Sequence, residues 1–174
     1  MPKIIENLRE NLLAETRREL LASGYENLNI RTIAKNCHAA VGTVYNYFPA
    51  KDILVANVML EDWLQGMTAA QAEMQNSAAL ADGVQALYRE MLAFTDRYRT
   101  MFRQNAMPLA GSAYAQRHTQ LRGQITAALR PLLCRFGSAP TETTLTLAAE
   151  ILLTAATEGW EFAQFYPVFE KILV

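Results

Sequence analysis

Residues 30–51, which read IRTIAKNCHAAVGTVYNYFPAK, bring together hydrogen-bonding side chains and exclude carboxylates. Ile33 lies on one apolar stripe at helical spacing, Val44 and Phe48 lie on another, and a small irregular run separates them. The pattern predicts two short helices joined by a tight turn, an arrangement whose second helix can enter a DNA major groove. No Asp or Glu occurs from residue 27 to residue 51, and a surface that approaches phosphates has a physical reason to lack them.

The second of these short helices, residues 41–48, is expected to turn small and hydrogen-bonding residues toward the groove. Gly42 allows close approach of the backbone, and Thr43 can bind a phosphate or a thymine methyl group. Tyr45 can touch a base edge or a phosphate, while Asn46 can make a paired contact with adenine. For Asn46 the alternative is an ordinary surface amide.

Three further residues have a structural reading beside the DNA-binding one. Tyr47 is either a phosphate contact through its hydroxyl or a core aromatic residue. Lys51, at the start of the next helix, is either a phosphate contact or a solvated cation. Val41 either touches a thymine methyl group or joins Val44 in the core.

Residues 24–54 resemble the DNA-binding domain of the TetR family of bacterial transcriptional repressors, and the run GTVYNYFPAKDIL is the most specific part of the match. The resemblance implies a homodimer that binds a palindromic operator and is released by a small molecule. It places a DNA-contacting residue at Arg31, for which a solvated side chain is the alternative, and the predicted set includes the neighbouring Thr32. The matching residues are Gly24, Tyr25, Ile33, Ala34, Gly42, Thr43, Tyr45, Tyr47, Phe48, Pro49, Lys51 and Asp52.

Two positions depart from the family pattern, which usually has Gly in the turn and Ser or another capping residue before the second helix. His38 stands at the first position and Ala40 at the second. A positive φ at His38 would be tolerable, because His is among the residues enriched in the left-handed region. A missing cap at Ala40 costs about 0.5–2 kcal/mol of local stability and leaves the first N–H groups of the helix free for a phosphate.

Charge and composition favour a packed helical protein with no global basic signal. Hydrophobic residues make up 51% of the 174, and the formal net charge is −1. Residues 1–58 hold seven Lys or Arg against six Asp or Glu, and residues 59–174 hold nine against eleven. DNA affinity is therefore expected to come from local arrangement and dimerisation, not from bulk charge.

Signals for export or membrane insertion are not found in the sequence. The beginning of the chain is charged throughout and lacks a signal-peptide core. Cys37 and Cys134 lie far apart, so no structural disulfide is expected. No run approaches the roughly eighteen apolar residues of a membrane span, and a cytoplasmic protein is expected.

Helical patterns cover the chain, so an all-α fold is predicted, with a three-helix DNA-binding head and a helical ligand-binding and dimerisation part. The predicted domains are residues 1–50 and residues 51–174, bridged by the fourth helix. Asn29 and Thr141 are suitable N-caps, and Pro167 is expected to end the final helix. The helices are expected at residues 2–23, 30–36, 41–48, 51–76, 80–105, 112–135 and 141–166.

The final predicted helix is apolar on most sides, which indicates burial on most sides. In a domain this small, one face can cover the core and another can cover a second copy of the chain. A strip of mostly small residues would let two such helices approach closely, and with the preceding helix it predicts a four-helix dimer interface. The predicted interface residues are Leu121, Ile125, Leu129, Ala148, Leu152, Ala155 and Gly159.

Methionine and aromatic residues are frequent in the second part, and at helical spacing such residues are usually plain core. The resemblance implies that some of them line a pocket for a small, largely apolar effector, which Met and aromatic walls suit. The predicted pocket residues are Trp63, Met67, Met91, Phe94, Tyr98, Phe102, Tyr114 and Trp160.

No pattern in the sequence favours an enzyme. His38 and His118 have no metal-binding spacing, and neither a Gly-rich phosphate loop nor a Ser-His-acid order is found. No metal and no cofactor are therefore expected. The predicted function is a regulator, a repressor released from its operator by a small molecule. The alternatives are a dimeric helical ligand-binding or interaction protein with a non-functional DNA head, and a helical-bundle enzyme.

Overall fold

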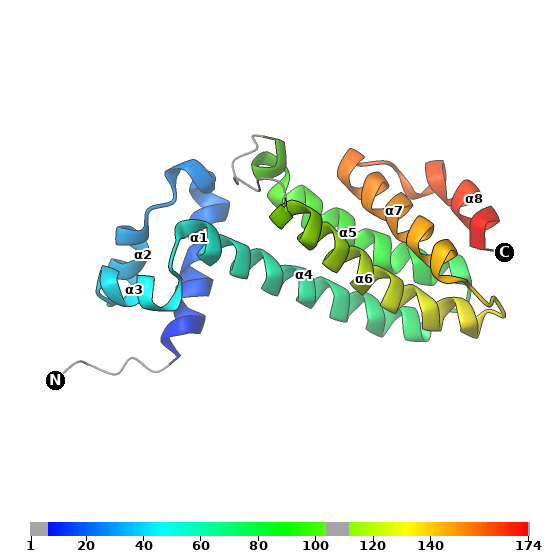
Figure 1. Ribbon diagram of the computed structural model, residues 1–174, viewed down its shortest axis with the longest axis horizontal. Coiled ribbons are helices and arrows are strands. Elements are labelled where there is room, and N and C mark those ends of the chain that lie inside the picture. The colour runs from blue at the N-terminus through cyan, green and yellow to red at the C-terminus, as the bar shows by residue number, and fades with distance from the viewer. Residues whose placement is uncertain (1–6, 104–111, 174) are drawn as a thin grey trace. The chain divides into compact units, whose positions relative to one another are not determined.

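The computed structural model describes residues 7–103 and 112–173, and this part of the chain consists of helices without a strand (Figure 1). The predicted all-α fold is confirmed, with the two short helices at the expected positions. Within the described ranges, no helix is long and apolar enough to cross a membrane. The helices are α1 (Leu8–Asn27), α2 (Ile30–Asn36), α3 (Val41–Tyr47), α4 (Lys51–Asn76), α5 (Leu80–Arg103), α6 (Ser112–Arg135), α7 (Glu142–Glu158) and α8 (Phe162–Leu173).

The helices form two compact units. The first unit comprises Met1–Trp63 with Arg97–Pro108, and the second comprises Leu64–Asp96 with Leu109–Val174. The first unit contains α1, α2 and α3, the second contains α6, α7 and α8, and α4 and α5 contribute residues to both. The functional division at residue 50 stays a prediction.

The core of the first unit is built from apolar side chains at helical spacing on α1 to α4. α1 packs on α2, and α2 packs on α3. Gly24, with φ 77° and ψ 169°, interrupts the regular geometry of α1 before its last residues. Removing these side chains from water is the main favourable contribution to folding of the unit. The buried residues include Leu12, Leu13, Leu20, Ile33, Ala34, Val44, Phe48, Leu54 and Val58.

The turn between α2 and α3 ends α2 on a residue in the left-handed region. His38 has φ 53°. Its N–H donates to the carbonyl of Lys35 at 3.1 Å, and the N–H of Ala39 donates to the carbonyl of Ala34 at 2.8 Å. These two bonds form a Schellman motif, with His at the position where Gly is usual. Ala40 precedes α3 without a side-chain cap, so the expected missing cap is confirmed, and the turn does place His38 in the left-handed region.

In the second unit, α6 packs on α7 and α7 packs on α8. The predicted cap at Thr141 is confirmed, because its hydroxyl accepts the N–H of the residue three positions on at 3.1 Å. The single helix predicted at 141–166 is wrong. α7 ends where Gly159, at φ 72°, adopts the left-handed conformation, and Pro167 lies inside α8. The helix-ending glycine outweighs the apolar spacing that continues beyond it.

Candidate nucleic-acid interface

α3 is anchored in the first unit by one side and exposes the other. Val44 and Phe48 are 1% and 3% exposed, so they fix the helix to the core. Tyr45 and Tyr47 are 46% and 48% exposed, and Asn46 between them is exposed as well. This exposure excludes Tyr47 as a core aromatic residue. The helix therefore offers three hydrogen-bonding side chains to a partner.

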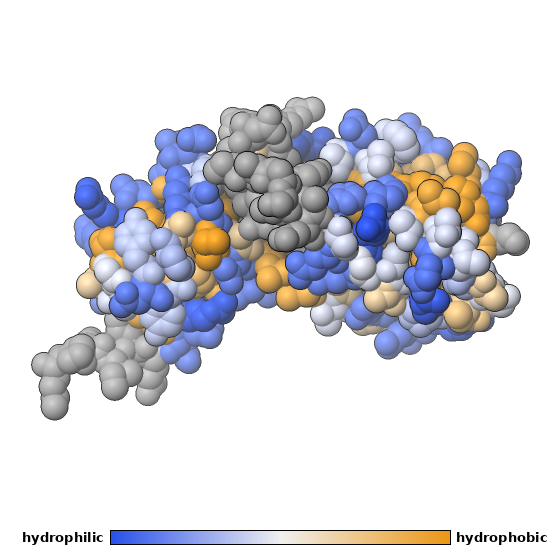
Figure 2. All heavy atoms as spheres, viewed as in Figure 1, coloured by the Kyte–Doolittle hydropathy of each residue, from blue (hydrophilic) through white to orange (hydrophobic). Residues whose placement is uncertain are grey.

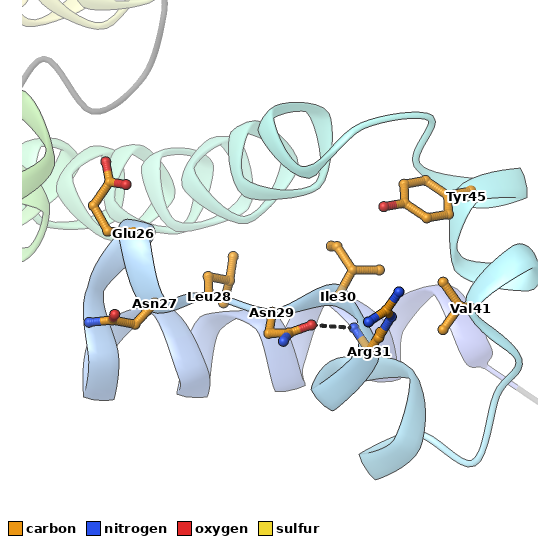
Figure 3. Close-up of a pocket in the computed structure, with 8 residues that line it drawn as sticks. All are labelled: Glu26, Asn27, Leu28, Asn29, Ile30, Arg31, Val41 and Tyr45. Atoms are coloured by element: carbon orange, nitrogen blue, oxygen red, sulfur yellow. Dashed lines mark hydrogen bonds between the residues drawn. The ribbon is translucent and has the colours of Figure 1, made fainter.

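The N-terminal ends of α2 and α3 border an open hollow of about 410 Å³, shown in close-up in Figure 3. Asn29 caps α2 as predicted, because its Oδ1 accepts the N–H of Arg31 at 2.9 Å. Arg31 is exposed and Val41 is half-buried, and both line the hollow together with Tyr45. Three of the predicted DNA-binding residues, from two helices, thus share one concave surface (Figure 3). The other lining residues are Glu26, Asn27, Leu28, Asn29 and Ile30.

The remaining predicted DNA-binding residues also reach the surface of the first unit. Thr32 and Gly42 are exposed, while Thr43 and Lys51 are half-buried. A Cβ added at Gly42 would meet no atom within 4 Å, so the backbone there is open to an approaching partner. The DNA contacts of these residues stay predictions.

The first turn of α4 contacts the last residues of α1 through Tyr25. The hydroxyl of Tyr25 donates to the carboxylate of Asp52, and the Nζ of Lys51 lies 4.3 Å from the centre of the Tyr25 ring. Burial, the hydrogen bond to Asp52 and the charges of Asp52 and Glu26 raise the pKa of Tyr25 to about 12. The hydroxyl therefore remains a donor near neutral pH.

A buried carboxylate, Asp62, joins α1, α4 and the end of α5 inside the first unit. Its side chain is 1% exposed. The Nε of Arg17 donates to its Oδ1 at 2.6 Å, and Arg97 Nη1 and the Tyr98 hydroxyl donate to its Oδ2 at 2.7 Å each. Arg17 also donates to Glu61 at 3.0 Å. Two cations and a hydroxyl thus replace the water that the buried carboxylate has lost.

The protonation of this cluster follows from its contacts. Burial acts to raise the pKa of Asp62, but the hydrogen bonds from Tyr98, Arg97 and Arg17 outweigh it, and the pKa lies below its ordinary value. Burial and the bond to Asp62 raise the pKa of Tyr98. At neutral pH Asp62 is therefore an ionised acceptor and Tyr98 a neutral donor.

The predicted effector-pocket residues fall in both units, and most of those described are buried. The Tyr98 hydroxyl is engaged by Asp62, and Trp160 is 42% exposed. No group of three His, Cys, Asp or Glu side chains within the described ranges is placed to hold a metal ion. A pocket formed by the predicted residues stays a prediction. Trp63, Met67, Met91 and Tyr98 are buried, Phe94 is half-buried, and the side chains of Phe102 and Tyr114 lie outside those described.

Most of the predicted dimer-interface residues are buried inside the second unit. Five of the seven have no exposed area, because α6 and α7 pack on each other there. Of the seven, only Leu121 and Gly159 retain exposed area, and the dimer contacts of these residues stay a prediction. The residues with no exposed area are Ile125, Leu129, Ala148, Leu152 and Ala155.

Exposed apolar side chains lie instead on the outer faces of α7 and α8. Leu147 is 50% exposed, Val168 61% and Ile172 37%. Figure 2 shows hydrophobic surface gathered over α8. These residues leave apolar surface on the second unit that a second copy of the chain can reach.

The sequence predicts no role for the side chains of Asp62 and Tyr25, although each contacts at least two others in the first unit. A signal for Asp62 was available, because it follows Val55 and Val58 on the apolar stripe of α4. A charged residue on an apolar stripe is expected to be paired. Tyr25 belongs to the matching motif, but neither of its partners on α4 follows from spacing.

The site and the fold define the class of protein. An all-helical chain that carries a helix-turn-helix with an exposed second helix has the fold of a DNA-binding transcriptional regulator. Residues 12–58 match the family of bacterial regulatory proteins described as the tetR family. The matched segment includes the motif at 24–54, which predicted a DNA-binding domain of this family.

Solved structures share this fold at low sequence identity. The fatty acid degradation regulator FadR from Bacillus halodurans is 13% identical, with a TM-score of 0.62 over 98% of this chain and 96% of that one. A bacterial regulatory protein in the tetR family from Rhodococcus RHA1 is 14% identical, with a TM-score of 0.60 over 97% and 98%. RolR without ligand is 19% identical, with a TM-score of 0.66 over 94% and 89%. A comparison with curated protein sequences finds no match.

Proposed function

We propose that the protein is a homodimeric transcriptional regulator that binds a palindromic DNA operator through α2, α3 and the first turn of α4 of each protomer. The observation that carries the proposal is the surface of α3, where two buried apolar residues anchor the helix and Tyr45, Asn46 and Tyr47 are exposed. The family match over residues 12–58 supports it. Two such helices about 34–36 Å apart would read successive major grooves of one palindrome.

The polar side of α3 would read the bases. Asn46 offers an amide that can bind adenine through two hydrogen bonds, and Tyr45 reaches a base edge from the hollow it shares with Arg31. Gly42 lets the backbone approach the duplex, and the methyl group of Val41 can contact a thymine methyl group. These contacts specify sequence.

Contacts to phosphate would fix the position of the head on the duplex. Tyr47 and Thr43 offer hydroxyl groups, and Lys51 offers a positive charge at the start of α4. Arg31 and Thr32 extend this set to the first turn of α2. The absence of Asp and Glu from residues 27–51 keeps repulsive charges away from the phosphates.

A second copy of the chain would pack on the outer faces of α7 and α8. The exposed apolar residues there, Leu147, Val168 and Ile172, supply area that is otherwise left in water. An isologous interface would relate two identical heads by a two-fold axis, which matches the symmetry of a palindrome. The family relationship supports dimerisation, since one recognition helix contacts few base pairs.

A small, largely apolar molecule would act as the effector and release the repressor from its operator. Met67 and Met91 are buried in the second unit and would supply part of the apolar lining that such a molecule requires. The molecule can shift DNA affinity only by the difference between its affinities for the DNA-competent conformation and the released one. Binding would be tested by fluorescence anisotropy of a labelled operator against a panel of apolar metabolites.

The decisive experiment is operator binding by wild type and variants. Genomic fragments retained by the protein would be footprinted, and the affinity would be measured as a function of salt concentration. Lys51→Ala should weaken binding to every sequence and lower the salt slope by about 0.9 for each phosphate that the lysine neutralises. Arg130→Ala removes one positive charge from α6 in the second unit and should leave the slope unchanged.

Asn46→Ala separates base reading from phosphate binding. It should change the preference among operator variants, with a loss of about 1–3 kcal/mol at the base pair it contacts. Uniform weakening over all sequences would move Asn46 to the phosphate-binding set. A dimer that ignores every duplex at low ionic strength would contradict the proposed function and support the ligand-binding alternative.

A further inference from the structure

Tyr25 makes two different contacts with the first two residues of α4. Its ring faces the ammonium group of Lys51 at 4.3 Å, and its hydroxyl donates to the carboxylate of Asp52. All three side chains are half-buried and belong to the first unit. The ring is brought to this place by the interruption of α1 at Gly24, which precedes it.

The two contacts act on one cation. A lysine side chain has several rotatable bonds and loses much conformational freedom when it is held in one place. The face of an aromatic ring attracts an ammonium group while leaving its N–H donors available to another acceptor. The Tyr25 ring therefore restricts Lys51 without using up the hydrogen bonds that a phosphate would accept.

The hydroxyl of Tyr25 acts on the neighbouring acid. Asp52 follows Lys51 directly in the first turn of α4, where a carboxylate is favoured by the helix dipole. A carboxylate beside a lysine competes with phosphate for its charge. The bond from Tyr25 satisfies one carboxylate oxygen of Asp52 and holds that group at the end of α1.

We propose that Tyr25 is a positioning residue for DNA binding: its ring holds the Lys51 ammonium group in place, and its hydroxyl holds Asp52 away from that cation. A phosphate of the duplex then meets a restrained lysine that has not formed an ion pair. The inference rests on the proposed function, in which Lys51 binds the phosphate backbone.

The proposal is tested by a double-mutant cycle in operator affinity. Tyr25→Leu removes both contacts and keeps an apolar side chain, while Tyr25→Phe keeps the ring and removes only the hydroxyl. Each is made alone and together with Lys51→Ala, and the dissociation constant Kd is measured at one salt concentration. Circular dichroism at the assay temperature confirms that each variant is folded.

Tyr25→Leu should raise Kd about two- to five-fold for each protomer, as expected for removal of a cation–π interaction at a partly exposed site. In the Lys51→Ala background the same change should raise Kd by less than about two-fold, because the residue through which Tyr25 acts is gone. Tyr25→Phe should bind DNA more tightly than Tyr25→Leu, since the Phe variant keeps the aromatic ring that attracts Lys51 and the Leu variant lacks it.

Three results would overturn the role of Tyr25 while leaving the proposed function intact. They are an unchanged Kd for Tyr25→Leu, an equal loss in both backgrounds, and Tyr25→Phe binding no better than Tyr25→Leu. An equal loss in both backgrounds would assign Tyr25 a purely structural role. Failure of the wild-type protein to bind any duplex would instead contradict the proposed function and this inference with it.

Discussion

Replacing Asp62 by Asn tests whether the buried ion cluster stabilises the first unit. The substitution keeps the size of the side chain and one acceptor oxygen, but it removes the negative charge that Arg17 and Arg97 share. The amide group would also present N–H donors where the carboxylate now accepts three hydrogen bonds. Two guanidinium groups and the Tyr98 hydroxyl would compete for a single acceptor.

The expected loss in the free energy of unfolding follows from how exposed the side chains of Arg17 and Arg97 are. Removing one member of a fully buried ion pair costs about 3–5 kcal/mol. The side chain of Asp62 is 1% exposed, but those of Arg17 and Arg97 are 26% and 44% exposed and can be rehydrated. We therefore expect Asp62→Asn to lower the free energy of unfolding by about 2–3 kcal/mol, below the range for full burial.

The matched control is Glu61→Gln. Glu61 is the preceding residue and also binds Arg17, but its side chain is 36% exposed. Its loss should cost less than about 1 kcal/mol, as for other solvent-exposed ion pairs. Urea unfolding of wild type and both variants would be followed by circular dichroism at equal protein concentration. Equal effects of the two substitutions, or a loss below about 0.5 kcal/mol for Asp62→Asn, would refute the reasoning.

The pH dependence of the free energy of unfolding gives a second test of the Asp62 cluster. Because the pKa of Asp62 is lowered in the folded protein, its ionisation contributes stability that is fully present above the ordinary aspartate pKa. That contribution is lost as the pH falls through the folded-state pKa. The stability difference between wild type and Asp62→Asn should therefore be constant from about pH 7 to pH 5 and shrink below about pH 4. A difference that grows in acid would contradict the assignment.

Three further substitutions, two of them with matched controls, test the turn, the helix packing and the dimer. His38→Gly should raise the free energy of unfolding by about 0.5–1 kcal/mol in thermal or urea unfolding, because φ 53° costs glycine no steric strain; a loss of stability would contradict the Schellman assignment. Gly83→Ala should destabilise by about 1–3 kcal/mol, since the new Cβ would lie 2.6 Å from Leu132 Cδ1. Gly123→Ala, whose Cβ meets nothing within 4 Å, should instead stabilise by about 0.5–1 kcal/mol. If both alanine substitutions changed the free energy of unfolding in the same direction, the close packing of Gly83 on Leu132 would be rejected. Val168→Glu should shift the protein from dimer to monomer in analytical ultracentrifugation, whereas Leu21→Glu at a comparably exposed position on α1 should not.

Local signals were sufficient for most of the helices and for the helix-turn-helix. Asn29 and Thr141 are caps in the structure because each places a side-chain oxygen on a backbone N–H at a helix start, an interaction within four residues. The spacing of Val44 and Phe48 fixed which side of α3 is buried. The break at Gly159 was not predicted, because apolar residues continue at helical spacing on both sides of it.

These local signals do not predict which side chains pair when they lie far apart in the sequence. Arg17 lies 45 residues from Asp62, and Arg97 lies 35 residues from it. Nothing in the spacing of the arginines says which of them meets which acid. The dimer residues show a related limit, because an apolar helix face such as that of Leu152 can be buried equally well by its own core or by a partner. The choice depends on how α6 and α7 pack in the single chain.

The electrostatics of the DNA-binding head depend on pairing more than on composition. The net charge of +1 over residues 1–58 would give little attraction for DNA if it were spread evenly. Just beyond this range, Asp62 and Glu61 are held by Arg17, and within it Asp52 is held by Tyr25. Within the described ranges, no ion pair joins a carboxylate to Arg31 or Lys51.

This pairing gives the weakly charged head a positively charged face. Among the described residues, Arg31 on α2 and Lys51 at the start of α4 remain available, beside a segment that has no Asp or Glu. A duplex approaching that face meets positive charge at short range, where screening by salt is weakest. Removing the partners of the acids should therefore reduce DNA affinity even though those partners do not touch DNA, and Tyr25 is the residue at which this can be measured most directly.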